Sequence, residues 1–313
     1  MITQEQKNTI SAAAAKWIED HNVTQADLAK KANINPAYLS NILRGNYTYK
    51  ANDVEADIPV KWFNQLAAAI GISIHKQYWK PIQTAELKHI IVELTAAKNN
   101  TRCVTIVTDT GLGKTYTIER FCNVHPQHTY KVTVNHMHKV RDILSELAEQ
   151  MGVPVKTYPL DTLIGIAKKM KDLRMMGCKP VIIIDEGENL RLAVVQMLKG
   201  LYDRINGYAS LVLIGTPQLL RLLERMRTND QPGAPQFYRR IKAGIKVVPA
   251  YNDFTPFFQE FGITEKGLRA LLTRICSNYG ELHDYLEPAL KEADEAEKPL
   301  TEDLFRLMYN LPK

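Results

Sequence analysis

The sequence predicts an α/β protein in which a parallel sheet flanked by helices follows an N-terminal all-α domain and precedes a small C-terminal helical lobe. Three observations predict this class. Short apolar runs alternate with amphipathic helical patterns between residues 101 and 219, as in the strand–helix units of a parallel sheet. Two short helices with a tight turn are predicted near the N-terminus. After residue 257 the patterns are helical.

At 313 residues the chain is long enough for two domains and a smaller lobe. We expect a helix-turn-helix domain at 1–75, a linker at 76–83, an α/β core at 84–256 and a helical lobe at 257–313. No apolar run reaches the ~18 residues of a membrane span, and the N-terminus lacks the features of a signal peptide. The four cysteines form no C-x-x-C pair, which favours free thiols in a reducing cytoplasm.

The net charge of +6 is unevenly distributed. Residues 221–246 are predominantly basic, whereas residues 281–303 are predominantly acidic. This asymmetry suits a protein with one side that faces a polyanion and a solvated tail. Charge runs are also common on ordinary wet surfaces, so the distribution alone is weak evidence.

Residues 24–46 predict two short helices joined by a turn: Thr24 suits an N-cap, Asn33 a left-handed turn, and Pro36 the start of a helix. The segment resembles the phage-repressor (Cro/C1-like) helix-turn-helix class, whose glutamine near the start of the first helix is matched by Gln25. In that class the second helix enters the major groove. Our predicted DNA contacts are Gln25, Asn35, Tyr38, Ser40, Asn41 and Arg44. Helix-turn-helix units also serve as protein-interaction domains, which is the alternative.

Two further helices frame the boundary between the first domain and the core. Residues 60–72 predict an amphipathic helix that completes the small bundle, and residues 84–100 predict a helix with a Thr N-cap. The stretch between these two helices contains Pro81, and its residues 76–83 are interpreted as the linker.

A phosphate-binding pattern lies between a predicted buried strand at 101–109 and a predicted helix at 116–124. TDTGLGKTYT departs from the Walker A pattern G-x-x-x-x-G-K-[ST] only in Thr108, which replaces the first glycine. Strand, loop and helix are the context that this pattern requires, because backbone N–H groups and the helix N-terminus face the phosphates. We predict that Lys114 neutralises the β- and γ-phosphates and that Thr115 holds Mg²⁺. The predicted nucleotide-binding residues are Thr108, Asp109, Thr110, Gly111, Leu112, Gly113, Lys114, Thr115 and Tyr116.

A near-continuous apolar strand ending in two carboxylates follows 70 residues later, in KPVIIIDEGENL (Walker B). Such a run is typical of a strand buried on both faces of a parallel sheet. Asp185 is predicted to bind Mg²⁺, and Glu186 to orient and deprotonate the attacking water. The alternative is that Asp185 and Glu186 are two solvated acids after a core strand. The phosphate-loop pattern upstream makes this alternative less favoured.

The remaining core patterns alternate between strand and helix. Strands are predicted at 130–135 and 210–219, and helices at 139–153, 161–177 and 191–207, joined by right-handed crossovers. Loops after the second and third strands should line a DNA path. The candidate phosphate contacts are His138, Lys139, Arg141, Lys168, Lys169 and Lys171. Solvated helix faces are the equally favoured interpretation of these residues.

The order of these parts resembles AAA+ ATPases, and most closely the family of phage Mu transposition protein B (MuB) with the TnsC-like transposition regulators. The domain order, VIIIDE, LVLIGT and YRRIK carry the resemblance, which covers nearly the whole chain. It implies ATP and Mg²⁺ as cofactors and ATP hydrolysis. It also implies that the strand at 210–219 lies between the two motif strands and ends in a residue that positions the lytic water. Thr216 occupies that place, where the family commonly has Asn.

The same resemblance implies two further site residues. An arginine after an aromatic residue reaches a neighbouring subunit's nucleotide in the family, which favours Arg240 first and Arg239 second; two arginines on a wet helix are the alternative. His283, in G-E-L-H, stands where related ATPases often have an arginine, and this replacement implies slow hydrolysis.

From the resemblance we expect an ATPase that self-associates on double-stranded DNA, largely independently of sequence, as an ATP-dependent oligomer or helical filament. It would deliver this DNA to a DDE-type transposase or activate that enzyme, in the cytoplasm of a bacterial host and encoded by a phage or mobile element. No membrane partner is expected. The alternative is a nucleotide-gated helix-turn-helix transcription regulator. A secretion-type or replication-loader ATPase is less favoured, because it leaves the N-terminal domain without a role.

Overall fold

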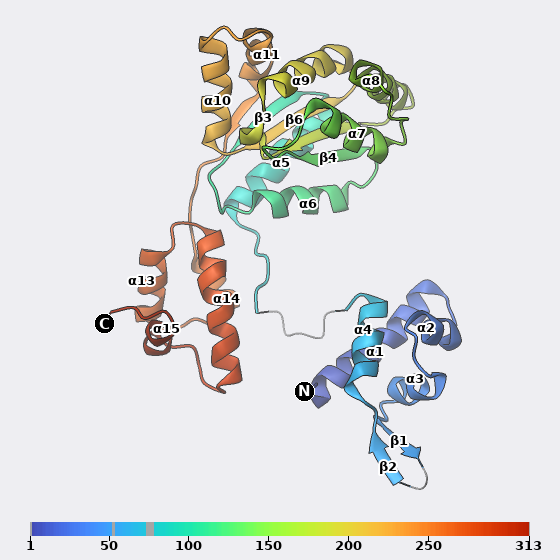
Figure 1. The fold of residues 1–313 in the computed structure, drawn as a ribbon. Coiled ribbons are helices and arrows are strands. Elements are labelled where there is room, and N and C mark those ends of the chain that lie inside the picture. Colours follow the sequence, from blue (N-terminus) through green and yellow to red (C-terminus); the bar gives the residue numbers. More distant parts are fainter. Residues whose placement is uncertain (1, 52–53, 73–77, 313) are drawn as a thin grey trace. The chain divides into compact units, whose positions relative to one another are not determined.

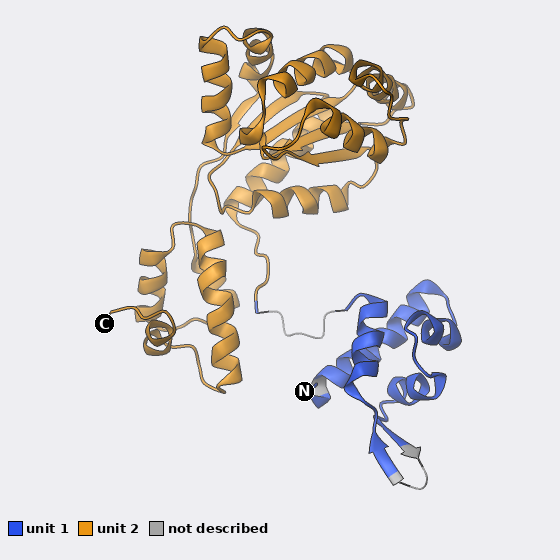
Figure 2. Ribbon diagram, viewed as in Figure 1, with its two compact units in different colours: residues 1–78 blue, residues 79–313 orange. Residues whose placement is uncertain are grey.

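The computed structural model describes residues 2–51, 54–72 and 78–312 and divides the chain into two compact units, residues 1–78 and 79–313 (Figure 2). The predicted linker at 76–83 straddles this division, although residues 76 and 77 lie outside the described ranges. Within those ranges, no helix is long and apolar enough to cross a membrane.

The first unit is mainly helical around one apolar core. Its core includes Ile10, Leu28 and Phe63, each at most 1% exposed. An antiparallel hairpin follows the third helix, so the region is not all-α as predicted. The described elements are α1 (Gln4–His21), α2 (Gln25–Lys31), α3 (Pro36–Leu43), β1 (Thr48–Ala51), β2 (Val54–Asp57) and α4 (Val60–Ile70).

The helices α2 and α3 and the turn between them form at the residues that the sequence predicts. The Thr24 hydroxyl accepts a hydrogen bond from the Asp27 N–H, and the Asp27 carboxylate accepts one from the Thr24 N–H. This capping box satisfies donors that the start of a helix leaves free. Asn33 has a φ of 50°, in the left-handed region, and Pro36 opens α3.

The second unit is built on a parallel five-stranded sheet of order β4-β5-β6-β3-β7. The predicted position of β6, between the two motif strands β5 and β3, is therefore confirmed. The short edge strand β7, preceded by the 3₁₀ turn η2 (Lys242–Gly244), was not predicted. The strands are β3 (Cys103–Val107), β4 (Thr129–Thr133), β5 (Val181–Asp185), β6 (Ser210–Gly215) and β7 (Ile245–Val247).

Helices cover both faces of this sheet (Figure 1). On one face α5 and α6 pack on Val104, Ile183 and Val212. On the other face α7, α8, α9, α10 and α11 pack on Ile182 and Leu213. These helices are α5 (Ala85–Asn100), α6 (Lys114–Val124), α7 (Val140–Met151), α8 (Pro159–Met175), α9 (Leu192–Ile205), α10 (Pro217–Thr228) and α11 (Ala234–Ile241).

A buried carboxylate joins the helical lobe to the start of α5. Glu86 is fully buried, and its two oxygens accept hydrogen bonds from the backbone N–H groups of Tyr251 and Asn252 and from the Tyr279 hydroxyl. Burial raises the pKa of Tyr279, and the Glu86 carboxylate raises it further, so the phenol stays a donor. The lobe comprises α12 (Thr255–Glu260), α13 (Lys266–Ile275), α14 (Tyr279–Glu295) and α15 (Glu302–Met308).

Candidate nucleotide-binding site

The predicted phosphate loop connects β3 to α6 in a conformation that needs glycine at two positions. Gly111 and Gly113 have φ values of 73° and 76°, in the region that favours glycine. Thr108 has no positive φ; it is buried, and its N–H donates to the Gly215 carbonyl at 3.1 Å. The backbone conformation at position 108 therefore does not require glycine, and threonine can adopt it.

Lys114 begins α6, and its side chain returns to its own loop. Its ammonium donates to the carbonyls of Thr108 at 3.2 Å and Asp109 at 2.8 Å. Burial lowers the pKa of Lys114, whereas the nearby carboxylates of Glu188 and Asp185 raise it. The loop thus holds a partly desolvated cation whose present partners are neutral carbonyls, which anionic phosphate oxygens would outcompete.

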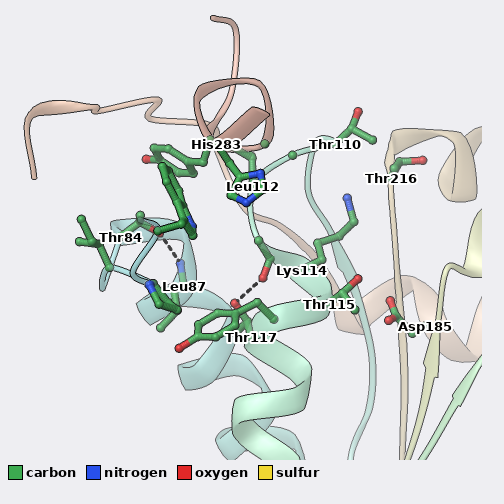
Figure 3. Close-up of a pocket in the computed structure, with 18 of the residues that line it drawn as sticks. Thr84, Leu87, Thr110, Leu112, Lys114, Thr115, Thr117, Asp185, Thr216 and His283 are labelled. Carbon is green, nitrogen blue, oxygen red and sulfur yellow. Dashed lines mark hydrogen bonds between the residues drawn. The ribbon is translucent and has the colours of Figure 1, made fainter. Parts of the chain in front are cut away.

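The loop borders a cavity of about 530 Å³. Figure 3 shows Lys114, Thr115 and Asp185 on one side of this cavity and His283 on the other. The predicted nucleotide contacts that line it are Thr110, Gly111, Leu112, Gly113, Lys114, Thr115 and Tyr116. Asp109 lines a neighbouring cavity together with Thr110 and Thr216.

Asp185 ends β5 with a fully buried side chain. Its Oδ1 accepts the Glu186 N–H at 2.9 Å, whereas Oδ2 is buried with no hydrogen-bond donor among the described residues. Burial raises the pKa of the Asp185 carboxyl, while the Glu186 N–H and the Lys131 ammonium lower it. This Oδ2, which has an ion-pair neighbour in Lys131 at 3.6 Å but no hydrogen-bond donor in the described part of the chain, lines the same cavity as Thr115. The pair of oxygens fits Mg²⁺, which commonly binds one or two protein oxygens together with nucleotide phosphates.

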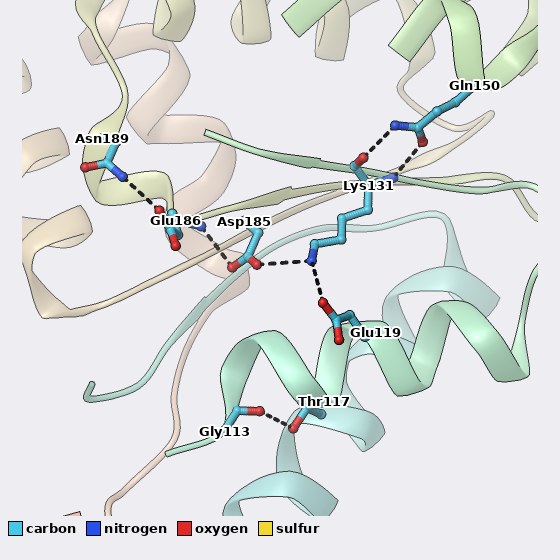
Figure 4. Close-up of polar contacts among 8 residues, drawn as sticks. All are labelled: Gly113, Thr117, Glu119, Lys131, Gln150, Asp185, Glu186 and Asn189. Atoms are coloured by element: carbon cyan, nitrogen blue, oxygen red, sulfur yellow. Dashed lines mark hydrogen bonds and ion pairs between the residues drawn. The ribbon is translucent and has the colours of Figure 1, made fainter. Parts of the chain in front are cut away.

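Glu186 follows in a left-handed conformation with a φ of 54°. Its Oε2 accepts a hydrogen bond from the Asn189 side chain at 3.2 Å (Figure 4). The same Asn189 amide donates to the Val134 carbonyl at 2.9 Å. Glu186 also lines the cavity. A carboxylate in this position suits the orientation of a water molecule next to bound phosphates.

Thr216 follows β6 and caps α10. Its hydroxyl accepts the Gln218 N–H at 3.3 Å, and its own N–H donates to Glu188 Oε2 at 3.2 Å. Glu188 was not among the predicted site residues. The 3₁₀ turn η1 (Gly187–Asn189) directs it back to the cavity, and the only signal in the sequence was a third acid two residues after Glu186.

The opposite end of the cavity is aromatic. Trp79 stacks on Phe257 with ring centroids 5.1 Å apart and meets the edge of His283 at 5.0 Å. His283 also lies 3.0 Å from the carboxylates of Asp284 and Glu287. Trp79 belongs to the predicted linker, so its place in the site was not predicted. Flat apolar side chains here suit a nucleobase.

The two candidate arginines of α11 differ in their surroundings. The Arg240 guanidinium lies 2.6 Å from the Asp203 carboxylate and donates to the Gln236 carbonyl. Arg239 is exposed, and the structure shows no ion pair for it among the described residues. Neither lines the cavity within its own chain.

The predicted DNA contacts of the first unit fall into two groups. Gln25 and Arg44 are exposed. The others have local partners: Asn35 caps α3, Asn41 donates to the Thr48 carbonyl at 3.1 Å, and Tyr38 packs against Tyr49 and Trp62. Ser40 is half-buried. The hairpin therefore engages part of the surface that we predicted to face DNA.

The predicted DNA contacts of the core lie on two segments. His138, Lys139 and Arg141 surround the start of α7, just after β4, and Lys139 and Arg141 are exposed. The three lysines lie within the helix α8 rather than in a loop, and the Lys171 ammonium sits 5.1 Å from the Tyr208 ring centre. The lysines of α8 are Lys168, Lys169 and Lys171.

Comparisons with known proteins agree with this geometry. Residues 97–223 match the family model of an AAA domain. The DNA transposition protein B of the Mu-like prophage FluMu in Haemophilus influenzae is 25% identical over 246 residues, which span 75% of this chain and 72% of the relative.

Two solved structures share the fold. The Aeropyrum pernix ORC2 protein in its ADPNP–ADP complexes has a TM-score of 0.53 at 19% identity over 75% of this chain and 70% of its own. The ORC1 protein of the same organism in complex with DNA has a TM-score of 0.51 at 17% identity over 74% and 66%. Fold and site define an AAA+ ATPase. Within that class the chain is MuB-like, similar to the transposition protein B of a Mu-like prophage.

Proposed function

We propose that this ATPase regulates DNA transposition: it assembles on double-stranded DNA when it binds ATP and delivers that DNA to a DDE-type transposase, or activates the transposase. The observation that carries the proposal is the similarity to a transposition protein B across 75% of the chain. Delivery to a transposase is the part of the proposal that rests on this similarity alone.

In the proposed reaction, Lys114 and the loop N–H groups bind the phosphates of ATP, and Thr115 and Asp185 hold Mg²⁺. The metal would supply charge neutralisation at the phosphates. Glu186 orients and deprotonates the attacking water, and Thr216 positions it from the end of β6. The geometry that supports these roles is the common cavity that all five side chains line.

Oligomerisation completes the proposed site. Arg240 is partly exposed and does not line the cavity of its own chain, so we propose that it acts on a neighbouring subunit's ATP. A cation supplied in this way stabilises charge that develops on the transferred phosphate. Hydrolysis then depends on assembly, and we propose that the assembly is a helical filament.

The DNA contacts that we propose combine both units. Gln25 and Arg44 on the first unit are exposed side chains that suit base or phosphate contacts, and Lys139 and Arg141 on the core suit phosphates. Contacts to phosphates read no sequence, so binding would be largely independent of sequence.

The test is electron microscopy of the protein with random-sequence duplex DNA and either ATP or ADP. We expect ordered filaments with ATP and their loss with ADP. The second candidate, a nucleotide-gated transcription regulator, is favoured by the exposed polar residues of α2 and α3. It predicts dimers on one preferred sequence and no filaments on random DNA, which would overturn our proposal.

A further inference from the structure

A lysine on the edge strand of the sheet faces the proposed metal site. Lys131 lies in the middle of β4, where alternate residues are buried and half-buried, so its side chain points to the same side as those of Thr129 and Thr133. Thr133 pairs with Asp185 in the register between β4 and β5. The strand therefore directs the lysine toward the Asp185 carboxylate.

The backbone of Lys131 is fixed at this position. Its N–H donates to the Gln150 side-chain oxygen at 3.1 Å, and its carbonyl accepts from the Gln150 amide at 2.7 Å (Figure 4). Gln150, from α7, thus satisfies both groups at the free edge of β4. The ammonium of Lys131 can therefore move only through rotations of its flexible four-carbon side chain.

That ammonium has two carboxylate neighbours of different kinds. It lies 3.6 Å from Asp185 Oδ2, on a side chain that is 1% exposed, and 4.0 Å from Glu119 Oε1, on a side chain that is 60% exposed. Among the described residues, no other basic nitrogen forms an ion pair with Asp185. Lys131 therefore neutralises a buried carboxylate while keeping a solvated one within reach.

A divalent cation at Asp185 and the Lys131 ammonium compete for the same negative charge. Both cannot sit close to Oδ2, because two cations a few ångströms apart repel each other. The fixed backbone keeps the ammonium nearby, but the stem lets it swing toward Glu119, on the first helix after the phosphate loop.

We propose that Lys131 is a built-in counter-ion of Asp185 that sets the Mg²⁺ concentration that nucleotide binding requires. It positions the carboxylate in the metal-free protein and moves toward Glu119 when Mg²⁺ and ATP bind. This inference rests on the proposed role of Asp185 as the carboxylate next to the metal.

The test is a Mg²⁺ titration of the binding of a fluorescent, non-hydrolysable ATP analogue to the full chain. Lys131→Met removes the competing charge, so the half-saturating Mg²⁺ concentration should fall about three- to tenfold. In EDTA, the thermal midpoint of the same variant should also fall, because a buried carboxylate loses its counter-ion; Mg²⁺ with the analogue should restore most of the difference. An unchanged or higher Mg²⁺ requirement would overturn the inference.

Three variants sharpen this test. Lys131→Arg keeps the charge and should keep the wild-type Mg²⁺ requirement. Glu119→Gln removes the second carboxylate, so the requirement should rise by up to about threefold; a fall would count against the swing toward Glu119. Asp185→Asn should abolish the Mg²⁺ dependence of analogue binding. If Asp185→Asn keeps the normal Mg²⁺ dependence of analogue binding, the proposed metal site is wrong. If Asp185→Asn loses this dependence but Lys131→Met has the wild-type Mg²⁺ requirement, only the proposed role of Lys131 is wrong.

Discussion

The guanidinium of Arg240 lies 2.6 Å from the carboxylate of Asp203 in the same chain, although both side chains remain partly exposed. Partly exposed ion pairs contribute about 0–1 kcal/mol. The ion pair therefore orients Arg240 on the surface of α11. It is weak enough for the guanidinium to leave Asp203 and bind another anionic group. This geometry is compatible with an arginine that leaves Asp203 for a neighbouring subunit's phosphates, as we propose.

Arg240→Ala should bind ATP as a monomer with near-normal affinity but lose DNA-stimulated hydrolysis by about 10²–10³-fold. In mixtures with Lys114→Ala that are shown to co-assemble, part of the activity should return, because one interface then combines a competent ATP site with an intact Arg240. Phosphate release by the mixture measures this recovery. Arg239→Ala is the matched control on the same helix. Full activity of Arg240→Ala together with loss in Arg239→Ala would transfer the role to Arg239.

Glu186→Gln should retain ATP and Mg²⁺ but slow hydrolysis by about 10²–10⁴-fold, because the amide cannot take a proton from water. The amide oxygen that replaces the Glu186 carboxylate can still accept the hydrogen bond from Asn189, so the fold of this segment should persist. Steady-state phosphate release and the lifetime of protein–DNA complexes are the measurements. An unchanged turnover rate would place the general base elsewhere.

Deletion of residues 1–78 should leave ATP-dependent assembly intact, because Trp79 and the rest of the cavity belong to the second unit. Its DNA affinity should fall, and the plot of log affinity against log salt should become shallower by about 0.9 for each DNA phosphate that the truncated protein no longer neutralises. Binding measured between low and high salt tests this. If the slope matches that of the full chain, the first unit does not contact phosphates.

Glu86→Ala should destabilise the second unit by about 1–3 kcal/mol, because the N–H groups of Tyr251 and Asn252 and the Tyr279 hydroxyl lose their shared acceptor. Thermal or urea denaturation measures the loss. Glu93→Ala, on the same helix, is the control; Glu93 lies 3.9 Å from a partly exposed Lys246 and should contribute about 0–1 kcal/mol. Equal stabilities of the two variants would show that Glu86 does not fasten the lobe to α5.

Local patterns in the sequence predicted much of this architecture. Thr24 and Pro36 mark helix starts because caps are made within a few residues, and the apolar run before Asp185 is buried on both faces of the sheet. The hairpin β1–β2 escaped prediction because it lacks a strong alternating pattern. The roles of Trp79 and Glu86 also escaped, since their partners lie 165 or more residues away in the chain.

The catalytic geometry was predictable only in part. The sequence motifs predict the chemical roles of Lys114, Thr115 and Asp185, and these three side chains line one cavity. Glu188 and Lys131 reach the same region through a 3₁₀ turn and through strand register, which depend on tertiary structure. The sequence around Lys131 contains no motif that predicts this position, and the only signal for Glu188 is that it follows Glu186 by two residues.

The central claim is that nucleotide binding at Lys114 drives cooperative assembly on DNA. Fluorescence anisotropy with random-sequence duplexes of increasing length, in ATP, in ADP and without nucleotide, tests it most directly. We predict that the wild-type protein binds tightly only with ATP, that its affinity rises with duplex length, and that Lys114→Ala loses this binding. ATP-independent binding to one preferred sequence, equally strong in Lys114→Ala, would contradict the account.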